Sequence, residues 1–558
     1  MKTLVFSYPN ENCPECHSRL KAYRLNRRTV KTGNGTYTAE HRIMICPVEG
    51  TRYRSMELDL MIPPKCTYAN DIMVESAMER FINGKSSSEM SSLFGLSESH
   101  ARKLSNKALE TFVKIHENNI SKLKASMKSY ILQIDGTTDA EFSMIVVVRD
   151  AIADFTLYAK KCDSESEASI REVLTAVKDK FGVPSGITCA LRSGILSAAQ
   201  GIFPETPIRI CLMHFLRDLG KDLMMALHTD LGILINRAGI KGGIKSILKG
   251  LPDYDQATLD EIDQGSCLNM EKAEFIAIRK ILEDFIFMNK SSGYGFPFSL
   301  RHINFFTACS EAEKKLSDLL PHVRNSKDLI SKIIGYLSRV THSIPIKEIA
   351  VKLRNINSCI FQRIRKAFMV PEKGNLSSDK YNPLTDDPIV HENCTVVFGE
   401  LEVYLKAALP EYMFSAAKIA IERYRKREAL LFSQNTDGTV PRTNNGMEIF
   451  FRKVRRNVRK RCGNIATGNI LAQSGDKLAL FQNMGNKRYI DLVFGSSDIY
   501  SVFGKYRKPE KGKRITGKET RRKAEKTRVM ICNDELSSNP YNEHVWEEVQ
   551  RFRSCTQS

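Results

Sequence analysis

The segment 130–213 restricts the fold of this 558-residue chain more than any other. Three apolar runs predict strands over 130–135, 142–148 and 155–160, and strands joined by short turns form an antiparallel meander. The pattern then predicts a helix over 165–181, a strand over 186–190, a helix over 195–202, a strand over 207–213 and a long helix from Phe215. Strands that arrive through helices can lie parallel to their neighbours, so we expect an α/β domain with one mixed sheet.

The charge of the chain restricts its partners. There are 84 Lys and Arg against 64 Asp and Glu, a formal charge of +20, which favours a polyanionic partner. No apolar run approaches the roughly 20 residues of a membrane span. The start of the chain lacks a signal-peptide pattern, and fourteen cysteines are too sparse for a disulfide scaffold. We therefore expect a cytoplasmic nucleic-acid protein, with a basic tail that is either a solvated segment or a phosphate clamp.

Two turns near the N-terminus have the spacing of zinc knuckles. Cys13-Pro-Glu-Cys16 and Cys46-Pro-Val-Glu-Gly50 resemble the two ligand-bearing turns of a zinc ribbon, which makes Cys13, Cys16 and Cys46 candidate Zn²⁺ ligands. The second turn has Glu49 where a fourth cysteine would stand. The other candidates for a fourth ligand are His17, His41 and Cys66. The alternative is a ribbon that folds without metal.

The segment 87–104 has the spacing of a helix-turn-helix. Gly95 suits the left-handed turn and Ser97 can cap the second helix. Residues at the start of that helix would face a DNA major groove, namely Glu98, Ser99, His100, Arg102 and Lys103. The alternative is a helical hairpin that packs against the neighbouring domain.

Two carboxylates stand where phosphodiester chemistry could use them. Asp135 ends the first predicted strand, and Gly136 lets the chain turn away from it. Glu448 lies at the start of a predicted helix, where Asn444 and Asn445 could cap or orient it. The basic residues around Glu448 are candidates for DNA contact together with these asparagines, namely Arg442, Arg452, Arg455, Arg456 and Arg459. The alternatives are an ordinary Asp at a turn and an ordinary Glu at a helix N-terminus.

Taken in order, these segments resemble a DDE-type, Mutator-like bacterial insertion-sequence transposase. Asp135 looks like the first acid of such an enzyme, the block 186–204 like its second-acid segment, and Glu448 like the terminal acid. Cys211 and His214 are similar to the Cys-x-x-His element beside the catalytic centre, where we expect His214 to orient other groups. A buried cysteine and an ordinary satisfied histidine are the alternative. The resemblance implies Mg²⁺ or Mn²⁺ on Asp135 and Glu448, an RNase-H-like domain and an all-α insertion.

The resemblance also suggests domain boundaries. We expect a zinc-ribbon-like module over 1–66 and a helix-turn-helix domain over 67–125. The RNase-H-like domain would have a first part over 126–229 and a terminal-Glu helical part over 433–504. The all-α insertion would occupy 230–432, with the better helical periods at 231–247, 271–289, 326–339, 347–367 and 401–430. A basic tail would follow over 505–558.

One position departs from the family. Ala190 stands where the second catalytic Asp belongs, and a methyl group cannot bind Mg²⁺. Asp150 and Asp218 are the nearest acids in sequence, and neither is expected at the place of the missing ligand. We therefore expect this chain to bind DNA but to cleave and join it poorly or not at all. Either an engineered Asp-to-Ala change or a natural loss fits the sequence.

Three functions are compatible with these features. The first is a transposase that binds element ends and target as double-stranded DNA, assembles as a homodimer or larger complex on the bacterial nucleoid, and catalyses cleavage and strand transfer. The second is a domesticated, non-catalytic, sequence-specific DNA-binding protein. The third is a two-metal nuclease without strand transfer, for which the N-terminal modules and the long insertion have no evident use.

Overall fold

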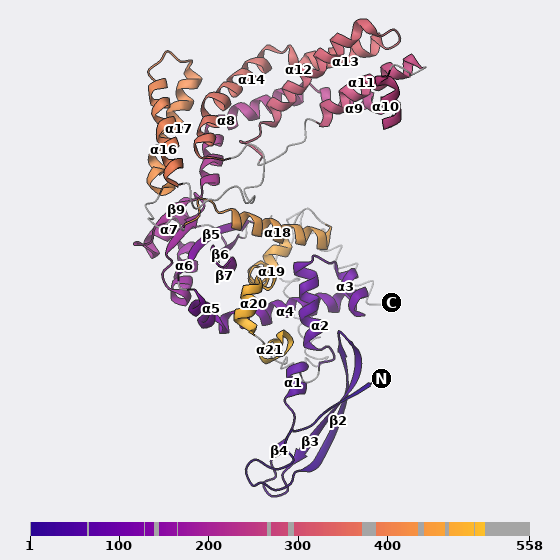
Figure 1. The fold of residues 1–558 in the computed structure, drawn as a ribbon, viewed down its shortest axis with the longest axis vertical. Coiled ribbons are helices and arrows are strands. Elements are labelled where there is room, and N and C mark those ends of the chain that lie inside the picture. The colour runs from indigo at the N-terminus through magenta and orange to yellow at the C-terminus, as the bar shows by residue number, and fades with distance from the viewer. Residues whose placement is uncertain are drawn as a thin grey trace, which may run out of the picture. The chain divides into compact units, whose positions relative to one another are not determined.

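A computed structural model describes residues 2–63, 66–127, 129–138, 144–164, 166–264, 269–287, 295–370, 387–432, 440–463, 468–495 and 497–507. The chain forms two compact units (Figure 1). The first contains residues 1–69 together with 504–558, and the second contains 70–503. Most of the predicted basic tail, and residues 142 and 143 of the predicted second strand, lie outside the described residues.

The first unit is built on a small sheet in the order β1-β3-β2, with β4 paired to the C-terminal end of β3. Its elements are β1 (Lys2–Phe6), β2 (Lys21–Thr32), β3 (Gly35–Ile45), β4 (Arg52–Tyr53) and α1 (Glu57–Met61). Two separate apolar clusters hold it. One includes Val30 and Leu58, and the other surrounds Cys13, Leu20 and Cys46. A small core of this kind is typical of modules that need an additional constraint to fold.

The second unit begins with helices that include the predicted helical pair. They are α2 (Asn70–Ala77), the π-helix η1 (Met78–Ile82), α3 (Ser87–Phe94), α4 (Glu98–Asn118) and α5 (Ile120–Ser126). Gly95 adopts the left-handed conformation with φ 61°, and the Ser97 side chain accepts from the His100 amide, as the sequence predicts. The second helix is a long one of 21 residues and not a short one. Its buried face, which includes Leu109 and Phe112, is what lengthens it.

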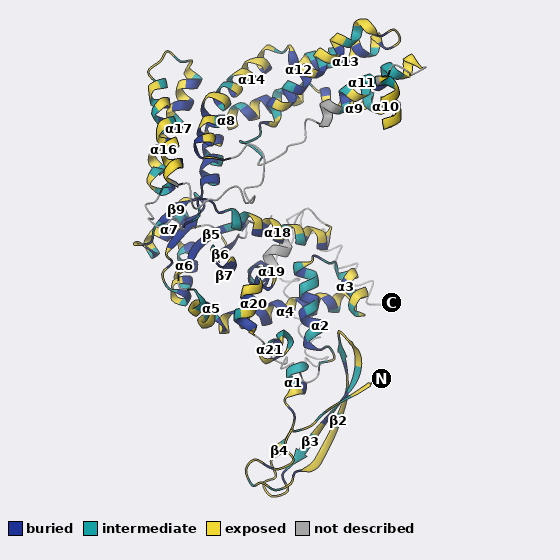
Figure 2. Ribbon diagram, viewed as in Figure 1, coloured by how far each residue is buried: buried dark blue, intermediate teal, exposed yellow. Residues whose placement is uncertain are grey.

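The central sheet has the order β7-β6-β5-β8-β9. Its strands are β5 (Ile131–Thr138), β6 (Met144–Asp150), β7 (Phe155–Cys162), β8 (Gly186–Cys189) and β9 (Ile208–Ile210). β5, β6 and β7 are antiparallel neighbours, whereas β8 and β9 continue the sheet in parallel from β5, so it is mixed as predicted. All seven residues of β6 are buried, so both faces of the sheet are covered (Figure 2).

Three helices connect or leave the parallel strands: α6 (Glu167–Phe181), α7 (Ser193–Ile202) and α8 (Leu212–Arg237). The predicted strand over 207–213 is too long, because α8 already begins at Leu212. Asp135 does not end its strand either. β5 continues to Thr138 along β6, and only its pairing with β8 stops at Ile134.

The region after α8 is helical, as predicted. Its helices are α9 (Ile240–Lys249), α10 (Gln256–Asp263), α11 (Met270–Phe287), α12 (Arg301–Leu319), α13 (Lys327–Thr341), α14 (Ile344–Ile356), the π-helix η3 (Asn357–Phe361), α15 (Gln362–Ala367), α16 (Asp387–Tyr404) and α17 (Glu411–Leu431). The predicted helix 231–247 is broken at Gly239, which has φ 68°. The predicted helix 401–430 is broken before Pro410, which disfavours helix in the residue before it.

The chain then returns to the sheet through α18 (Asn445–Cys462), α19 (Gly468–Phe481), the 3₁₀ turn η4 (Gln482–Gly485), α20 (Lys487–Phe494) and α21 (Ile499–Tyr506). α18 contacts β5, and α19 contacts β6 and β7. Within the described residues, no helix has the length and apolar character to cross a membrane.

Candidate active site

Three residues of the central sheet form a row just beyond its parallel pairs. Ile134 pairs with Cys189, and Cys189 pairs with Ile210. One residue further along each strand brings Asp135, Ala190 and Cys211 into register. Paired residues of neighbouring strands point to the same face of a sheet, so the register places Ala190 beside Asp135. This row lies at the carboxyl ends of the parallel strands, where open α/β sheets place their ligands.

The segment that precedes α18 is bound along the same face of the sheet. The Arg209 guanidinium donates to the Val440 carbonyl at 2.7 Å, and the Thr188 hydroxyl donates to the Pro441 carbonyl at 2.9 Å. The Leu212 amide donates to the Arg442 carbonyl at 2.9 Å. Three consecutive carbonyls of this segment are therefore satisfied by β8, β9 and α8, which fixes where α18 begins.

Asn444 makes the connection closest to Asp135. Its Nδ2 donates to the Ile134 carbonyl at 3.1 Å, and its amide donates to Cys211 Sγ at 3.1 Å. It does not cap α18 through its side chain. Arg442 is 2% exposed and Asn444 is fully buried, so the prediction that they contact DNA is wrong for this conformation. They hold the chain on the sheet instead. Asn445, the first residue of α18, is half-buried.

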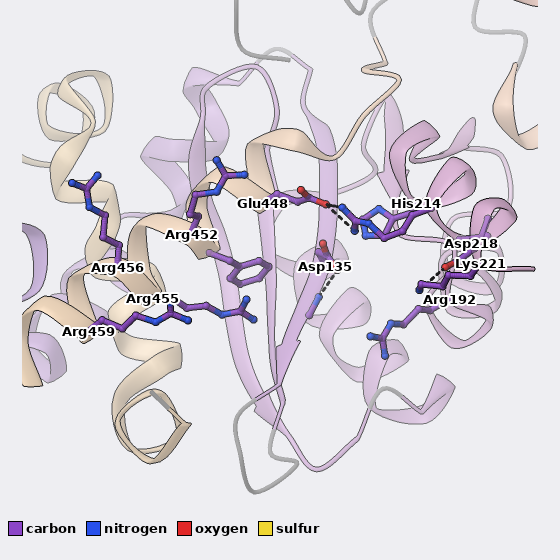
Figure 3. Close-up of a pocket in the computed structure, with 14 residues that line it drawn as sticks. Asp135, Arg192, His214, Asp218, Lys221, Glu448, Arg452, Arg455, Arg456 and Arg459 are labelled. Atoms are coloured by element: carbon purple, nitrogen blue, oxygen red, sulfur yellow. Dashed lines mark hydrogen bonds and ion pairs between the residues drawn. The ribbon is translucent and has the colours of Figure 1, made fainter. Parts of the chain in front are cut away.

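Asp135 and Glu448 line one cavity of about 950 Å³, so the predicted return of the acidic helix to the sheet is confirmed (Figure 3). Figure 3 shows both carboxylates between the arginines of α18 and the first turns of α8. Glu448 is held there by Arg217, whose Nη1 and Nη2 lie 3.3 and 3.4 Å from Glu448 Oε1. Both partners are about one-third exposed to solvent.

The two carboxylates and His214 influence one another electrostatically. Burial raises the pKa of Asp135, and the charge of Glu448 raises it further, against the opposing effects of His214, the Gly136 amide and Arg192. Burial lowers the pKa of His214, but Cys211 and the charges of Asp135 and Glu448 outweigh burial and raise it to about 9. His214 is therefore protonated at neutral pH. Its buried Nδ1 has no hydrogen-bond partner among the described residues.

Cationic side chains make up most of the polar lining of the cavity. Glu448 and the four predicted arginines of α18, Arg452, Arg455, Arg456 and Arg459, share one face at helical spacing. Arg452, Arg456 and Arg459 are exposed, and Arg455 donates to the Thr137 hydroxyl. These residues form a cationic wall around two acids, an arrangement suited to a phosphodiester backbone.

Sequence reasoning missed further lining residues on α8 and after β8. They are Arg192, Arg217 and Lys221, and Asp218, which was not expected near the missing ligand, lines the cavity as well. Arg217, Asp218 and Lys221 follow His214 at the i+3, i+4 and i+7 positions that share one face of a helix. That spacing is visible in the sequence once α8 is taken to begin at Leu212. The strand predicted over 207–213 concealed it.

Among the described residues, the sheet offers no further acid beside Asp135. Ala190 is 1% exposed and is not among the residues that line the cavity, although Leu191 and Arg192 are. Asp150 is buried and accepts from the amides of Ile131, Ile152 and Ala153, which is a structural role. Asp218 does line the cavity, where it is ion-paired to Lys221 at 3.1 Å.

The residues predicted to contact DNA from the second helix of the helical pair lie at the start of α4. Ser99, Arg102 and Lys103 are exposed, and His100 is half-buried. Burial, followed by the charges of Lys103 and Lys107, lowers the pKa of His100.

The three cysteines of the N-terminal turns form a cluster that could hold a metal ion. The Sγ atoms of Cys13, Cys16 and Cys46 lie within 4.8 Å of one another. Burial raises the pKa of the Cys46 thiol, but hydrogen bonds, first from Ser18 and then from the Glu49 amide, lower it to about 6. That favours the thiolate that binds metals.

None of the predicted fourth ligands joins this cluster among the residues the structure describes. Glu49 contributes its amide, at 3.3 Å from Cys46 Sγ. His41 is buried with its Nε2 3.2 Å from the Ser55 carbonyl, and Cys66 packs in the other apolar cluster of the unit. His17 is likewise not part of the cluster. Ser18 Oγ lies 3.0 Å from Cys16 Sγ and 3.4 Å from Cys46 Sγ.

Comparison with known proteins adds no family to this geometry. No protein-family model matches the chain, and a search of curated proteins finds no match to it.

Proposed function

We propose that this chain is a DNA transposase of the DDE type whose catalytic centre contains Asp135 and Glu448. The observation that supports this proposal best is the shared cavity, in which two acids from distant parts of the sequence meet within a wall of arginines. Local structure alone does not explain the position of Glu448. The loop before it is hydrogen-bonded to β8, β9 and α8 through three backbone carbonyls.

The topology supports an RNase-H-like assignment for the central domain. The elements occur in the order that the resemblance implies. Three antiparallel strands are followed by two parallel strands that are reached through helices, and the helix with Glu448 returns to the sheet. We assign the helices between α8 and α18 as the all-α insertion, α3 and α4 as the helix-turn-helix, and the Cys13–Cys16–Cys46 cluster as a zinc-ribbon-like site.

The residues present fit a divalent metal ion at Asp135 and Glu448. The carboxylates of both residues line one cavity, and hard cations such as Mg²⁺ prefer such oxygen ligands. A bound Mg²⁺ would supply activation of the attacking oxygen and stabilisation of the leaving oxygen. Arg217 contacts only Oε1 of Glu448, which leaves Oε2 available for a metal ion.

The protein itself contributes position and charge. Arg452, Arg456 and Arg459 present exposed guanidinium groups to a DNA backbone beside the acids. His214 keeps a proton next to Asp135, and β5 holds Asp135 on a rigid strand with hydrogen-bonded neighbours on both sides.

Two observations favour a second function, which is DNA binding without catalysis. Ala190 directly follows β8, one residue past the pair of Ile134 with Cys189, so this strand end supplies no acid where the resemblance implies one. Arg217 neutralises the other acid, Glu448. A protein that keeps the cationic wall and loses the metal site would still bind DNA.

One experiment separates these functions. A supercoiled plasmid that contains the DNA flanking this gene is incubated with Mg²⁺ or Mn²⁺, and nicked, cut and joined products are quantified by gel electrophoresis. Restoring an acid with Ala190→Asp is expected to raise the rate by about 10²-fold or more, because a lost metal ligand removes several kcal/mol of transition-state stabilisation. Glu448→Gln in that background is expected to abolish the gain.

Ala190→Asn is the matched control, since it has the size of Asp without the charge. If Ala190→Asp binds DNA as tightly as the original chain and gains no activity over Ala190→Asn, the catalytic assignment is wrong and the DNA-binding function stands. If the original chain does not bind the plasmid DNA, both functions are excluded.

A further inference from the structure

A second cavity, of about 720 Å³, lies between the helix-turn-helix and the far end of α18. Arg80 of η1, Arg102 of α4, Arg461 of α18 and Lys477 of α19 line it, and Glu98 is its one carboxylate among the described residues. The cavity is separate from the one that contains Asp135, and the two have no lining residue in common. Hydroxyl groups of Ser86, Ser87 and Ser99 complete much of the lining.

The three arginines of this cavity lie close enough to repel one another. Arg80 and Arg461 both stack on the ring of Phe81, with guanidinium carbons 5.5 and 4.8 Å from its centroid. Burial, followed by the charges of Arg461 and Arg102, lowers the pKa of Arg80 to about 10. Within the described part of the chain, Arg80 and Arg102 make no ion pair; Arg80 Nη1 donates to Ser105 Oγ at 3.2 Å, and Arg80 Nε is buried without a hydrogen-bond partner. Such a group of cations is relieved by a bound anion.

Hydrogen bonds from α18 and η4 to η1 and to Asn83, the residue after it, hold this cluster in place. Asn457 Nδ2 donates to the Ile82 carbonyl at 2.7 Å, and Lys460 Nζ donates to the Asn83 carbonyl at 3.1 Å. Gln482 Nε2 donates to the Phe81 carbonyl at 3.2 Å. The capped N-terminus of α3, at Ser86 and Ser87, also faces the cavity and adds the positive end of a helix.

We propose that this cavity binds one backbone phosphate of a DNA duplex, held jointly by Arg102 of the helix-turn-helix and by Arg80 and Arg461 beneath it. The inference rests on the proposed function for the identity of the polyanion. Arg461 follows Glu448 by thirteen residues in the same helix, which is about 20 Å along its axis. The cavity would therefore hold a phosphate apart from the candidate catalytic cavity, toward the other end of α18.

The test is a double-mutant cycle on DNA affinity. Binding of a fluorescent mixed-sequence duplex is measured over a range of NaCl concentrations for Arg102→Gln, Arg461→Gln and the double variant. Each single variant is expected to bind about tenfold more weakly, as for the loss of a hydrogen bond to a charged group. Because both arginines hold one phosphate, the double variant should lose little more than either single variant. The slope of log affinity against log salt should fall by about one in all three.

Lys103→Gln is the matched control, because Lys103 is an exposed neighbour of Arg102 that does not line the cavity. Its effect should add fully to that of Arg461→Gln. Arg461 is 7% exposed, so thermal unfolding of each variant is recorded; the exposed Arg102 tests the proposal even if Arg461→Gln unfolds.

Three results would overturn the proposal. Additive losses for Arg102 and Arg461, with the slope falling by about two, would mean two separate phosphates. Unchanged duplex affinity together with lost binding of inorganic pyrophosphate would mean a site for a free anion. Unchanged affinity for both would mean no anion site. If the unmodified chain binds no duplex, the proposed function is wrong as well. If it binds the duplex and only the variants behave differently from expectation, the phosphate site alone is wrong.

Discussion

At the scale of single residues, the N-terminal cysteines allow a direct test. Three Sγ atoms within 4.8 Å of one another are close enough to bind one ion, and zinc binding would convert that closeness into folding free energy. We expect the purified chain to contain about one zinc ion per molecule and Cys16→Ser to lose most of it. Elemental analysis of the protein measures the stoichiometry, and thermal unfolding with and without a chelator measures the stabilisation.

Cys66→Ser is the control, since Cys66 packs in the other apolar cluster and should leave the zinc content unchanged. If the purified chain contains no zinc and its unfolding temperature does not change with chelator, the module is a ribbon that folds without metal. The sequence correctly placed Cys13, Cys16 and Cys46 together, because knuckle spacing is local. It could not find Ser18 beside them, since a serine two residues after Cys16 is common in any turn.

At the scale of elements, the link between β8 and the segment before α18 depends on a glycine. A Cβ built on Gly186 would lie 2.3 Å from Val440 Cγ2, so no larger residue fits while this segment is seated. We expect Gly186→Ala to lower the free energy of unfolding by about 1–3 kcal/mol through overpacking. It should also increase hydrogen exchange at the start of α18. The double variant Gly186→Ala/Val440→Ala should recover most of both losses, because the second change removes the methyl groups in conflict.

Gly335→Ala is the matched control, since nothing lies within 4 Å of a Cβ at that helical position. It should stabilise the chain slightly, as alanine favours helix over glycine. Destabilisation by Gly186→Ala that Val440→Ala does not relieve would show that the segment is not seated as described.

The same elements show how far the sequence alone could lead. Strand order up to β8 and the helical pair α3–α4 followed from periodicity and turn residues, which act locally. The return of α18 was predicted only through the resemblance, and the geometry that achieves it was not predicted. That geometry depends on hydrogen bonds from Arg209, Thr188 and Asn444 to backbone carbonyls. Every residue has a backbone carbonyl, so these contacts leave no pattern in the sequence. For the same reason Asn444 was assigned to DNA, although it is fully buried.

At the scale of the whole molecule, His116 joins three parts of the second unit. It lies on α4, its Nδ1 is 2.9 Å from the Tyr489 hydroxyl of α20, and its Nε2 is 2.9 Å from the Leu157 carbonyl of β7. The carbonyl can only accept, so Nε2 is protonated and Nδ1 accepts from Tyr489. The neutral ring thus connects α4 to the sheet and to α20.

This connection predicts a loss of stability in acid. Burial lowers the pKa of His116 to about 4, whereas an unfolded histidine has a pKa of about 6.5. Between these values the unfolded chain binds a proton that the folded chain does not. The free energy of unfolding should therefore fall as pH drops from about 6.5 to about 4, by about 3 kcal/mol from this residue at most. Urea unfolding at a series of pH values measures the fall, and His116→Gln should make it shallower.

Tyr489→Phe is the control that separates titration from hydrogen bonding. It removes the hydroxyl that donates to His116 but leaves the histidine buried, so it should lower stability at every pH and keep the acid-dependent fall. His228 and His302, whose pKa values burial also lowers to about 4, add a fall that both variants retain. A fall of equal size in His116→Gln and in the unmodified chain would show that His116 takes up its proton without breaking the connection between α4 and the sheet.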